Sequence, residues 1–211
     1  VFSRKKEPSA DEYQKLFSMI QEQTGRLSHL AEILLDMTGI QSVERSDSIS
    51  LAELTDEVCC DLAAIADQKK VELIQEEGDC TVTGSYLLLY RAVYNLVENA
   101  IKYNHSGGKV TVKISQTKAL PAAHSKPADY ALVEVTDTGI GISPEYQEKI
   151  FAPFFRVDKS RSRAMGGAGL GLALVAEIAR QHGGQVKVLA SSKKGSTIAL
   201  MLPINSPLIE I

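Results

Sequence analysis

Residues 95–103, with the sequence NLVENAIKY, carry a polar and an apolar pattern at once. Asn95, Asn99 and Lys102 are four and three residues apart and so share one face of a helix. The apolar residues of the same segment line another face: Leu96, Val97, Ala100 and Ile101. Two carboxamides beside an ammonium group suit a hydrated Mg2+ and phosphate oxygens, because magnesium keeps several waters and takes few protein ligands. A solvated surface stripe explains the same spacing equally well.

A second motif, DTGIGISP at residues 137–144, directly follows a stretch in which apolar and polar residues alternate. Gly139 and Gly141 permit a tight turn and let the backbone approach a flat ligand closely. The carboxylate of Asp137 has the capacity to accept a hydrogen bond from an exocyclic amine. An ordinary turn that leads into a helix cap at Ser143 accounts for these residues equally well.

Three of the five phenylalanines of the chain lie within residues 151–155, in the sequence FAPFF, and Arg156 follows them. Further cations come next: Lys159, Arg161 and Arg163. The aromatic side chains are suited to anchor a loop, and its basic end is suited to cover phosphate groups. A core turn followed by a solvated run of charges is the alternative interpretation.

The glycine-rich sequence GGAGLGL at residues 166–172 opens a stretch with helical periodicity. Glycines before a helix leave backbone N–H groups free to bind an anion at the positive end of the helix dipole, so the segment predicts a phosphate site. A dinucleotide-binding fingerprint is disfavoured, because Leu172 occupies the place of the third glycine and a basic loop precedes the motif. A Walker-type loop is disfavoured because no Lys-Ser or Lys-Thr pair follows.

Outside these motifs, hydrophobic periodicity predicts one folded domain. A capping box of Ser50 and Glu53 opens a helix whose apolar face runs to Ile65, and further helices are predicted at residues 85–103 and 169–182. Alternation predicts five strands, at residues 71–75, 109–114, 130–136, 185–190 and 197–202, with a hairpin loop at 119–129. These elements show no βαβ regularity and predict an α+β fold, a two-layer α/β sandwich with one sheet face on the helices and the other on solvent.

Residues 9–40 carry apolar side chains three, four and seven residues apart: Leu16, Ile20, Leu27, Leu30, Leu34 and Met37. This seam predicts a long N-terminal helix that needs a partner helix, with a helix folded back on its own domain as the alternative. Residues 42–50 are polar and charge-mixed and predict a linker.

The composition excludes several classes of protein. A net charge of −3 and a pI of about 5.9 argue against nucleic acid as a partner, because polyanion binding needs a positive surface. The apolar runs are far shorter than the roughly 20 residues of a spanning helix, so no membrane contact is expected of this chain. Cys59, Cys60 and Cys80 have neither disulfide nor zinc-site spacing and are predicted to be small buried hydrophobes in a reducing cytosol.

In their order along the chain, the four motifs resemble the N, G1, F and G2 boxes of the ATP-binding catalytic domain of bacterial sensor histidine kinases, within the gyrase, Hsp90 and MutL superfamily. The resemblance covers about residues 50–203 and implies the Bergerat ATP-binding fold, with ATP and Mg2+ as cofactors. In the hydrolysing relatives, the position that matches Asn95 resembles a glutamate that activates water. A carboxamide cannot take up a proton as a carboxylate can, so Asn95 points to phosphoryl transfer onto another residue.

The resemblance also implies a role for each motif residue. Asn95, Lys102 and Arg156 are the expected catalytic set, with Lys102 at phosphate and Arg156 at the γ-phosphate. Asn99 is the expected Mg2+ ligand, and Asp137 is expected to read the amino group of adenine. The other residues expected at the nucleotide are Tyr103, Gly139, Gly141, Ile142, Phe155, Gly167, Gly169, Leu170, Gly171 and Leu172.

The segment from Phe155 to Ala168 is dense in charge and glycine, and we expect it to be a mobile lid over the nucleotide. Many relatives carry a threonine where Ala168 stands, so a hydroxyl contact with phosphate is lost there. Neither His29, on the N-terminal helix, nor any other histidine is followed by the acid and Thr-Pro signature of a phosphoacceptor. His182 is expected to cap a helix end, where a positive charge is favourable.

By the same resemblance, residues 1–47 are the second helix of the dimerisation hairpin with its linker, and residues 48–211 are the catalytic domain. We therefore expect a truncated kinase that binds nucleotide without labelling itself. In the intact protein, the hairpin forms a homodimer and its histidine passes the phosphoryl group to a cognate response regulator. This part is expected to be the cytoplasmic portion of a membrane-bound sensor.

Two other functions fit parts of the pattern. A nucleotide-gated interaction module, or an anti-sigma-type kinase of the same superfamily, is the alternative to a histidine kinase. A gyrase-like ATPase is a third reading, which Asn95 disfavours. Phosphoryl transfer to a separate hairpin that bears the acceptor histidine distinguishes the kinase from the module.

Overall fold

The computed structural model describes residues 13–14, 16–21, 24, 43–119, 128–157 and 169–204. The described residues between 13 and 24 are helical, and their large apolar side chains are exposed: Tyr13, Leu16, Phe17, Met19 and Ile20. The rest of the predicted N-terminal helix, with His29, lies outside the described residues. So do the tip of the predicted hairpin loop and the predicted lid from residue 158 to Ala168, with Gly167.

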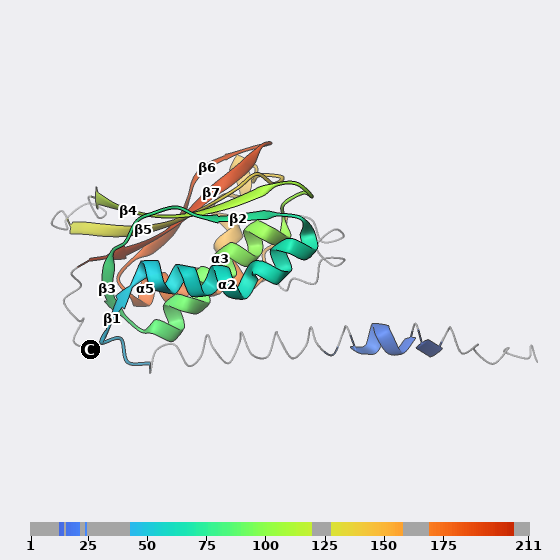
Figure 1. Ribbon diagram of the computed structural model, residues 1–211, viewed down its shortest axis with the longest axis horizontal. Coiled ribbons are helices and arrows are strands. Elements are labelled where there is room, and N and C mark those ends of the chain that lie inside the picture. Colours follow the sequence, from blue (N-terminus) through green and yellow to red (C-terminus); the bar gives the residue numbers. More distant parts are fainter. Residues whose placement is uncertain are drawn as a thin grey trace, which may run out of the picture.

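Three helices cover one face of a five-stranded sheet (Figure 1). The helices are α2 (Leu51–Lys69), α3 (Tyr86–Lys102) and α5 (Gly171–Gln181). The strands, in the order β2-β4-β5-β7-β6, are β2 (Glu72–Gln75), β4 (Lys109–Ala119), β5 (Ala128–Asp137), β7 (Gly195–Pro203) and β6 (Gln185–Ser192). The arrangement confirms the predicted two-layer α/β sandwich of an α+β fold.

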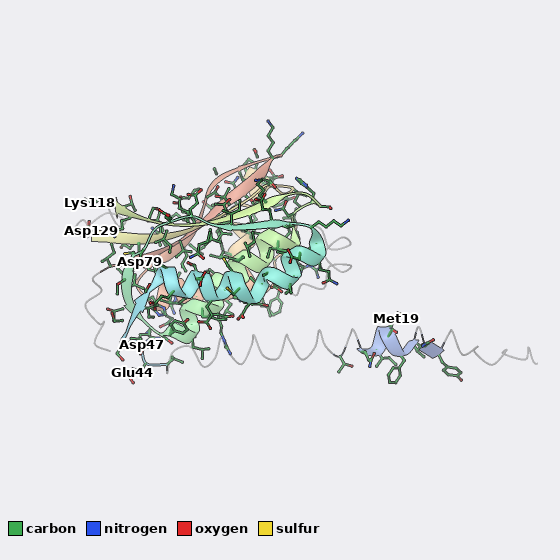
Figure 2. All side chains as sticks on the ribbon, viewed as in Figure 1. Met19, Glu44, Asp47, Asp79, Lys118 and Asp129 are labelled. Atoms are coloured by element: carbon green, nitrogen blue, oxygen red, sulfur yellow. The ribbon has the colours of Figure 1, made fainter. Side chains whose placement is uncertain are left out.

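The strands pair antiparallel except β2, which runs parallel to β4. The five predicted strands are confirmed, and four of them are longer than predicted, with β4 and β5 extending into the predicted hairpin loop. Figure 2 labels Lys118 and Asp129, a cross-strand pair near the end of that hairpin. Two short 3-10 helices, η2 (Pro144–Tyr146) and η3 (Lys149–Phe151), follow β5.

A separate two-stranded sheet corrects the predicted linker. Its strands are β1 (Asp47–Ser50) and β3 (Thr81–Gly84), paired antiparallel. The last four residues of the stretch predicted as linker, 42–50, thus belong to the folded body. The reason is burial, because Ile49 of β1 and Val82 of β3 lie opposite each other and are 2% exposed.

Helix α2 begins as its sequence predicts. The Ser50 hydroxyl accepts from the N–H of Glu53 at 3.2 Å, and a side chain from another segment, Asp79, accepts from the N–H of Ala52 at 3.1 Å. One face of the helix is buried: Leu51, Leu54, Thr55, Val58, Leu62 and Ala66. Ile65, predicted on that face, is 37% exposed, because the face continues to Ala66 instead.

Helix α3 is joined to α2 on the solvent side as well as through the core. The hydroxyl of Tyr86 donates to Glu57, and that of Tyr90 donates to Asp61. The bond to Glu57, followed by burial, raises the pKa of Tyr86 to about 12. None of the helices in the described residues has both the length and the apolar content that crossing a bilayer requires.

The main core fills the space between the helices and the sheet (Figure 2). Most of the apolar side chains of α3 are buried in it. A second, smaller cluster is buried apart from it: Tyr130, Leu132, Ala199 and Met201. In strand alternation these residues lie opposite the core-facing Val133 and Leu200, on the outer face of the sheet. The expectation that this face is on solvent is therefore wrong for the middle of β5 and β7, where bulky neighbours cover one another.

Candidate functional site

The first residue of α5 packs directly on the polar face of α3. A Cβ atom added to Gly171 would lie 2.5 Å from Asn95 Oδ1 and 3.6 Å from Asn99 Nδ2. The two helices run antiparallel, because His182 at the other end of α5 contacts Ser85 at the start of α3. The glycine contact therefore joins the first and fourth sequence motifs in space.

The two asparagines of α3 use their NH2 groups in hydrogen bonds within the helix. Asn95 Nδ2 donates to the backbone carbonyl of Arg91 at 2.8 Å, and Asn99 Nδ2 donates to that of Asn95 at 2.7 Å. The remaining Oδ1 atoms are hard oxygen ligands of the kind Mg2+ accepts. No group of three or more His, Cys, Asp or Glu that could hold a metal occurs among the described residues. A magnesium ion at these two asparagines would therefore need oxygens from water or from a ligand, which fits the donor set of a nucleotide site.

Asp137 ends β5 with both carboxylate oxygens engaged. Oδ1 accepts from the N–H of Gly139 at 2.7 Å, and Oδ2 accepts from the hydroxyl of Ser196 at 2.7 Å. Each carboxylate oxygen has a second acceptor position, so Asp137 keeps capacity for a donor on a ligand. Sequence reasoning missed Ser196, which is 7% exposed and directly opposite Asp137 on β7. A hydroxyl residue just before an apolar strand pattern is the only sequence feature that hints at it.

Two glycines hold the second motif against its neighbours. A Cβ on Gly139 would lie 2.4 Å from the carbonyl oxygen of Tyr103, and one on Gly141 would lie 1.8 Å from that of Ser192. Gly141 also has a φ of 70°, in the left-handed region that favours glycine. The N–H of Ile142 donates to a serine hydroxyl of β6 at 2.7 Å. The second motif is thus fixed on one side to the end of α3 and on the other to the β6–β7 hairpin.

The third and fourth motifs meet through their backbones. The N–H of Phe154 donates to the carbonyl of Gly169 at 2.9 Å, and Gly169 has a φ of 74°. The ring of Phe155 lies 5.7 Å from that of Tyr146, between ring centroids. Phe154 is 63% exposed, which corrects the expectation that the phenylalanines together anchor this loop. Its backbone, held to Gly169, has a φ of 62°, and its side chain lies in solvent.

Arg156 has buried donors without a partner. Its Nε and Nη2 atoms are buried, and no acceptor within the described part of the chain reaches them. The side chain passes beside Gly169, where an added Cβ would lie 3.2 Å from Arg156 Cγ. A buried donor left unsatisfied costs about 1–3 kcal/mol, and more when it is charged. Two guanidinium donors are chemically suited to bind an anion.

The end of α3 brings two more expected residues to the same region. Lys102 Nζ lies 5.9 Å from the centroid of the Tyr103 ring, within the range of a cation–π contact. Tyr103 is the C-cap of α3, and its carbonyl accepts from the N–H of Ile140 at 3.4 Å. Both side chains are half-buried. The polar face of α3 therefore reaches the loop that carries Asp137.

The two leucines of the fourth motif face the core. Leu170 is 1% exposed, and Leu172 packs against the main core from a half-buried position. The Leu170 side chain is enclosed by protein, so its part in ligand binding is restricted to its backbone. As the N-cap residue of α5, Leu170 offers no side-chain oxygen to the first N–H groups of the helix.

The cysteines take no part in this region. Burial, with smaller contributions from Asp56 and Cys60, raises the pKa of the Cys59 thiol to about 11. A thiol with this pKa stays protonated at neutral pH and is a poor nucleophile. Cys80 is buried as predicted, but Cys60 is exposed, because it lies on the solvent side of α2.

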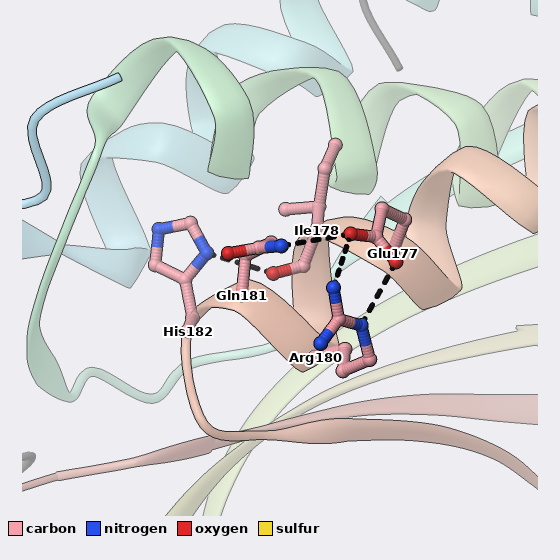
Figure 3. Close-up of polar contacts among 5 residues, drawn as sticks. All are labelled: Glu177, Ile178, Arg180, Gln181 and His182. Atoms are coloured by element: carbon pink, nitrogen blue, oxygen red, sulfur yellow. Dashed lines mark hydrogen bonds and ion pairs between the residues drawn. The ribbon is translucent and has the colours of Figure 1, made fainter. Parts of the chain in front are cut away.

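His182 ends α5 as a neutral base, which corrects the expected positive cap. Its Nδ1 donates to the carbonyl of Ile178 at 2.8 Å (Figure 3), and its Nε2 accepts from the N–H of Ser85 at 3.0 Å. Burial lowers the pKa of His182, its bond to the Ile178 carbonyl offsets part of this, and nearby Arg45 lowers the pKa further. A protonated ring would turn an N–H toward the N–H of Ser85, so the contact requires the neutral form.

The chain is similar in sequence to a known protein family and to two sensor kinases. The profile of the family described as histidine kinase-, DNA gyrase B- and HSP90-like ATPases matches residues 84–206. The sensor-like histidine kinase SenX3 of Mycobacterium tuberculosis is 35% identical over 185 residues, which cover 86% of this chain and 43% of SenX3. The sensor histidine kinase RppB of Synechocystis is 34% identical over 201 residues, which cover 92% of this chain and 42% of RppB. The chain thus spans less than half the length of these relatives.

The solved structure of a histidine kinase has the same fold as this chain. The mycobacterial sensor histidine kinase MprB superposes with a TM-score of 0.59 at 28% identity. The superposition covers 75% of this chain and 97% of the MprB chain.

Proposed function

Because the chain belongs to the family of histidine kinase-, DNA gyrase B- and HSP90-like ATPases, we propose that it is the ATP-binding catalytic domain of a sensor histidine kinase. One observation carries the proposal. Four motifs that are far apart in the sequence are joined in space: Gly171 packs on the second half of α3, Gly139 packs on Tyr103 at its C-cap, and Gly169 packs on the third motif. Each motif alone is explained by a local role in a turn, a cap or a surface. Such local roles do not require the four motifs to lie together.

The base half of the proposed site is built on Asp137. The carboxylate accepts hydrogen bonds from Gly139 and Ser196 on two sides. Through a remaining lone pair it accepts a hydrogen bond from the exocyclic amino group of adenine. Tyr103 flanks the base from the end of α3, and Gly139 and Gly141 keep the loop close enough to reach it.

The phosphate half is built on α3, Arg156 and the start of α5. Arg156 supplies two buried guanidinium nitrogens with no acceptor among the described residues, and the N-terminus of α5 supplies N–H groups that no side-chain cap occupies. Asn99, with Asn95 beside it, holds Mg2+ through its amide oxygen, and Lys102 adds a positive charge. When bound, the ion neutralises charge on the phosphate oxygens.

The proposed reaction is transfer of the γ-phosphoryl group to a histidine on another segment. The bond from the γ-phosphorus to the bridging oxygen breaks, a bond to an imidazole nitrogen forms, and ADP leaves. Such transfers have loose transition states, so positioning and charge neutralisation by Lys102 and Arg156 supply most of the catalysis. Asn95 has no basic group with which to activate water, which favours transfer over hydrolysis.

The remaining roles follow from the relatives. A response regulator receives the phosphoryl group, and the N-terminal helical segment is half of a hairpin through which two copies pair. We place this domain on the cytoplasmic side of a sensor.

Asp137→Asn tests the site. Replacing the carboxylate by an amide removes its charge and half of its acceptors, so we expect calorimetry to show ATP binding weakened by about 1–3 kcal/mol. Asp129→Asn is the matched control, because Asp129 is an exposed carboxylate on the same strand, at the opposite end from Asp137. Equal ATP affinity in Asp137→Asn and the wild type would remove Asp137 from the site.

A further inference from the structure

We infer that Asn104 and Thr138 form a clasp that sets the spacing between the base half and the phosphate half of the nucleotide site. Neither residue belongs to the set assigned to ligand contacts above, and both act through their neighbours as positioning residues. The inference rests on the proposed function, because the two halves are defined by it. We call the hydrogen-bonded group of Asn104, Thr138 and the Lys109 backbone the 104–138 clasp.

Hydrogen bonds join three segments in the clasp. The Thr138 hydroxyl accepts from the N–H of Lys109 at 2.9 Å and donates to Asn104 Oδ1 at 3.2 Å. Asn104 Nδ2 donates to the carbonyl of Lys109 at 2.8 Å, and Asn104 Oδ1 also accepts from the N–H of His105 at 3.0 Å. Both side chains are half-buried, and both use donor and acceptor groups. Such a network holds its members in one arrangement more firmly than single bonds do.

The backbone leaves room for this clasp at Gly108. A Cβ there would lie 2.1 Å from Asn104 Oδ1 and 2.8 Å from Thr138 Oγ1. Gly108 is buried, so the two polar side chains occupy space that a larger residue at this position would take. The loop after α3 is therefore shaped to bring Asn104 to Thr138.

The position of the clasp in the chain gives it a function. Asn104 comes two residues after Lys102, and Thr138 comes directly after Asp137. The clasp is thus a side-chain bridge between the end of the helix that holds the phosphate-binding groups and the end of the strand that holds the base-binding carboxylate. Beside it, the carbonyl of Tyr103 accepts from Ile140 at the long distance of 3.4 Å, so the backbone contact alone is a weak tie.

A fixed spacing matters for a ligand that touches both halves. ATP gains from both sets of contacts only when they are held at the distance that the nucleotide spans, because misplacing one half by about 1 Å can lose a large part of the gain. Adenosine, which has no phosphates, uses the base half alone and does not depend on the spacing. The clasp is therefore expected to affect ATP affinity and to leave adenosine affinity unchanged.

The test is Thr138→Val in the full chain, with ATP affinity measured by calorimetry and adenosine affinity by NMR titration. Valine keeps the shape of threonine and removes the hydroxyl. We expect ATP affinity to fall about 5- to 30-fold, as for one or two lost hydrogen bonds of a network, and adenosine affinity to stay within about twofold. Thr138→Ser keeps the hydroxyl and is expected to restore ATP affinity.

Thr136→Val is the matched control. Thr136 lies two residues earlier on β5, and its hydroxyl pairs with that of Thr197 on the outer face. We expect ATP binding by this variant to equal that of the wild type. If Thr138→Val does not fold, Asn104→Ser takes its place, because it removes the same bridge from the other side.

The outcomes separate this inference from the proposed function. Wild-type protein that fails to bind ATP overturns the proposed function and the clasp together. Wild-type protein that binds ATP, with Thr138→Val binding it equally well, overturns the clasp alone. A parallel loss of ATP and adenosine affinity in Thr138→Val also overturns it, because that result shows damage to the base half instead of a change in spacing.

Discussion

The N-termini of α3 and α5 lie at opposite ends of one antiparallel helix pair and differ in the hydrogen bonds of the donors around them. At the start of α3, the first N–H donates to the carboxylate of Asp47 at 3.2 Å, and the preceding N–H, that of Ser85, donates to His182. At the start of α5, Leu170 stands in the capping position and provides no side-chain acceptor. Close by, two buried nitrogens of Arg156 have no acceptor among the residues that the structure describes.

We interpret the α3 end as structural and the α5 end as part of the proposed binding site. Buried polar groups in folded proteins are nearly always hydrogen-bonded, so unpaired ones need an explanation. At the α3 end, the N–H groups of Tyr86 and Ser85 are matched within the chain, by Asp47 and His182. At the α5 end we propose that an anion accepts from the free donors. The comparison predicts that changes at the first end alter stability and that changes at the second alter binding.

Leu89→Ala is the largest of these changes. Leu89 is fully buried beside Gly84 near the start of α3, so removing its side chain leaves a cavity. We expect the free energy of unfolding to fall by about 2–5 kcal/mol in denaturant titrations. The folded fraction is expected to bind ATP normally. A variant that keeps its stability and loses ATP affinity would reverse the comparison.

Arg156→Met is expected to weaken ATP binding without lowering the stability of the fold. Methionine removes the unpaired guanidinium and keeps the apolar stem, so the ligand-free protein is expected to melt at the same or a higher temperature. Its affinity for ATP is expected to fall by about 1.5–3 kcal/mol, the value of hydrogen bonds to a charged group. Thermal melts and calorimetry on the same samples measure the two effects. Lower stability with unchanged ATP affinity would mean that Arg156 is structural.

Acidification is expected to give the smallest loss in the free energy of unfolding. The loss arises at the α3 end, where His182 accepts from Ser85. Because the pKa of His182 is lowered in the fold, the unfolded chain takes up a proton at about pH 6.5, while the folded chain still resists it. The His182 contribution to stability is therefore full above that pH. It is lost as the pH falls toward the lower pKa of the folded state, by up to about 1.4 kcal/mol per pH unit.

Thermal melts between pH 7.5 and pH 5 follow this loss. His182→Gln is expected to flatten the profile, whereas His105→Gln, at an exposed histidine, is expected to leave it unchanged. The same profile in His182→Gln and the wild type would assign the acid sensitivity to other groups.

The main elements of the fold could be predicted because their side chains alternate or repeat. Strands β1 and β3 could not, since each has four residues and presents one buried hydrophobic, Ile49 or Val82, among polar neighbours. The covered outer face was missed although residues 130–133 are apolar without interruption. Such a run indicates a strand buried on both faces, whereas a half-buried strand alternates.

The candidate site was predictable motif by motif, because each motif is a local pattern of residue types. What joins the motifs could not be read from the sequence. Ser196 reaches Asp137 only through the pairing of β5 with β7, and Asn104 reaches Thr138 only because α3 ends beside β5. These contacts depend on which strands and helices become neighbours in the fold, which a local pattern of residue types does not determine.

The contact of Gly171 with Asn95 couples two positions that are 76 residues apart. A methyl group at position 171 would lie 2.5 Å from the Asn95 amide oxygen, which is too close unless that side chain shifts. Alanine at position 171 would therefore displace the Asn95 carboxamide. Divergent copies of this domain with a larger residue at position 171 are expected to differ also in the residue at position 95 or in its side-chain position.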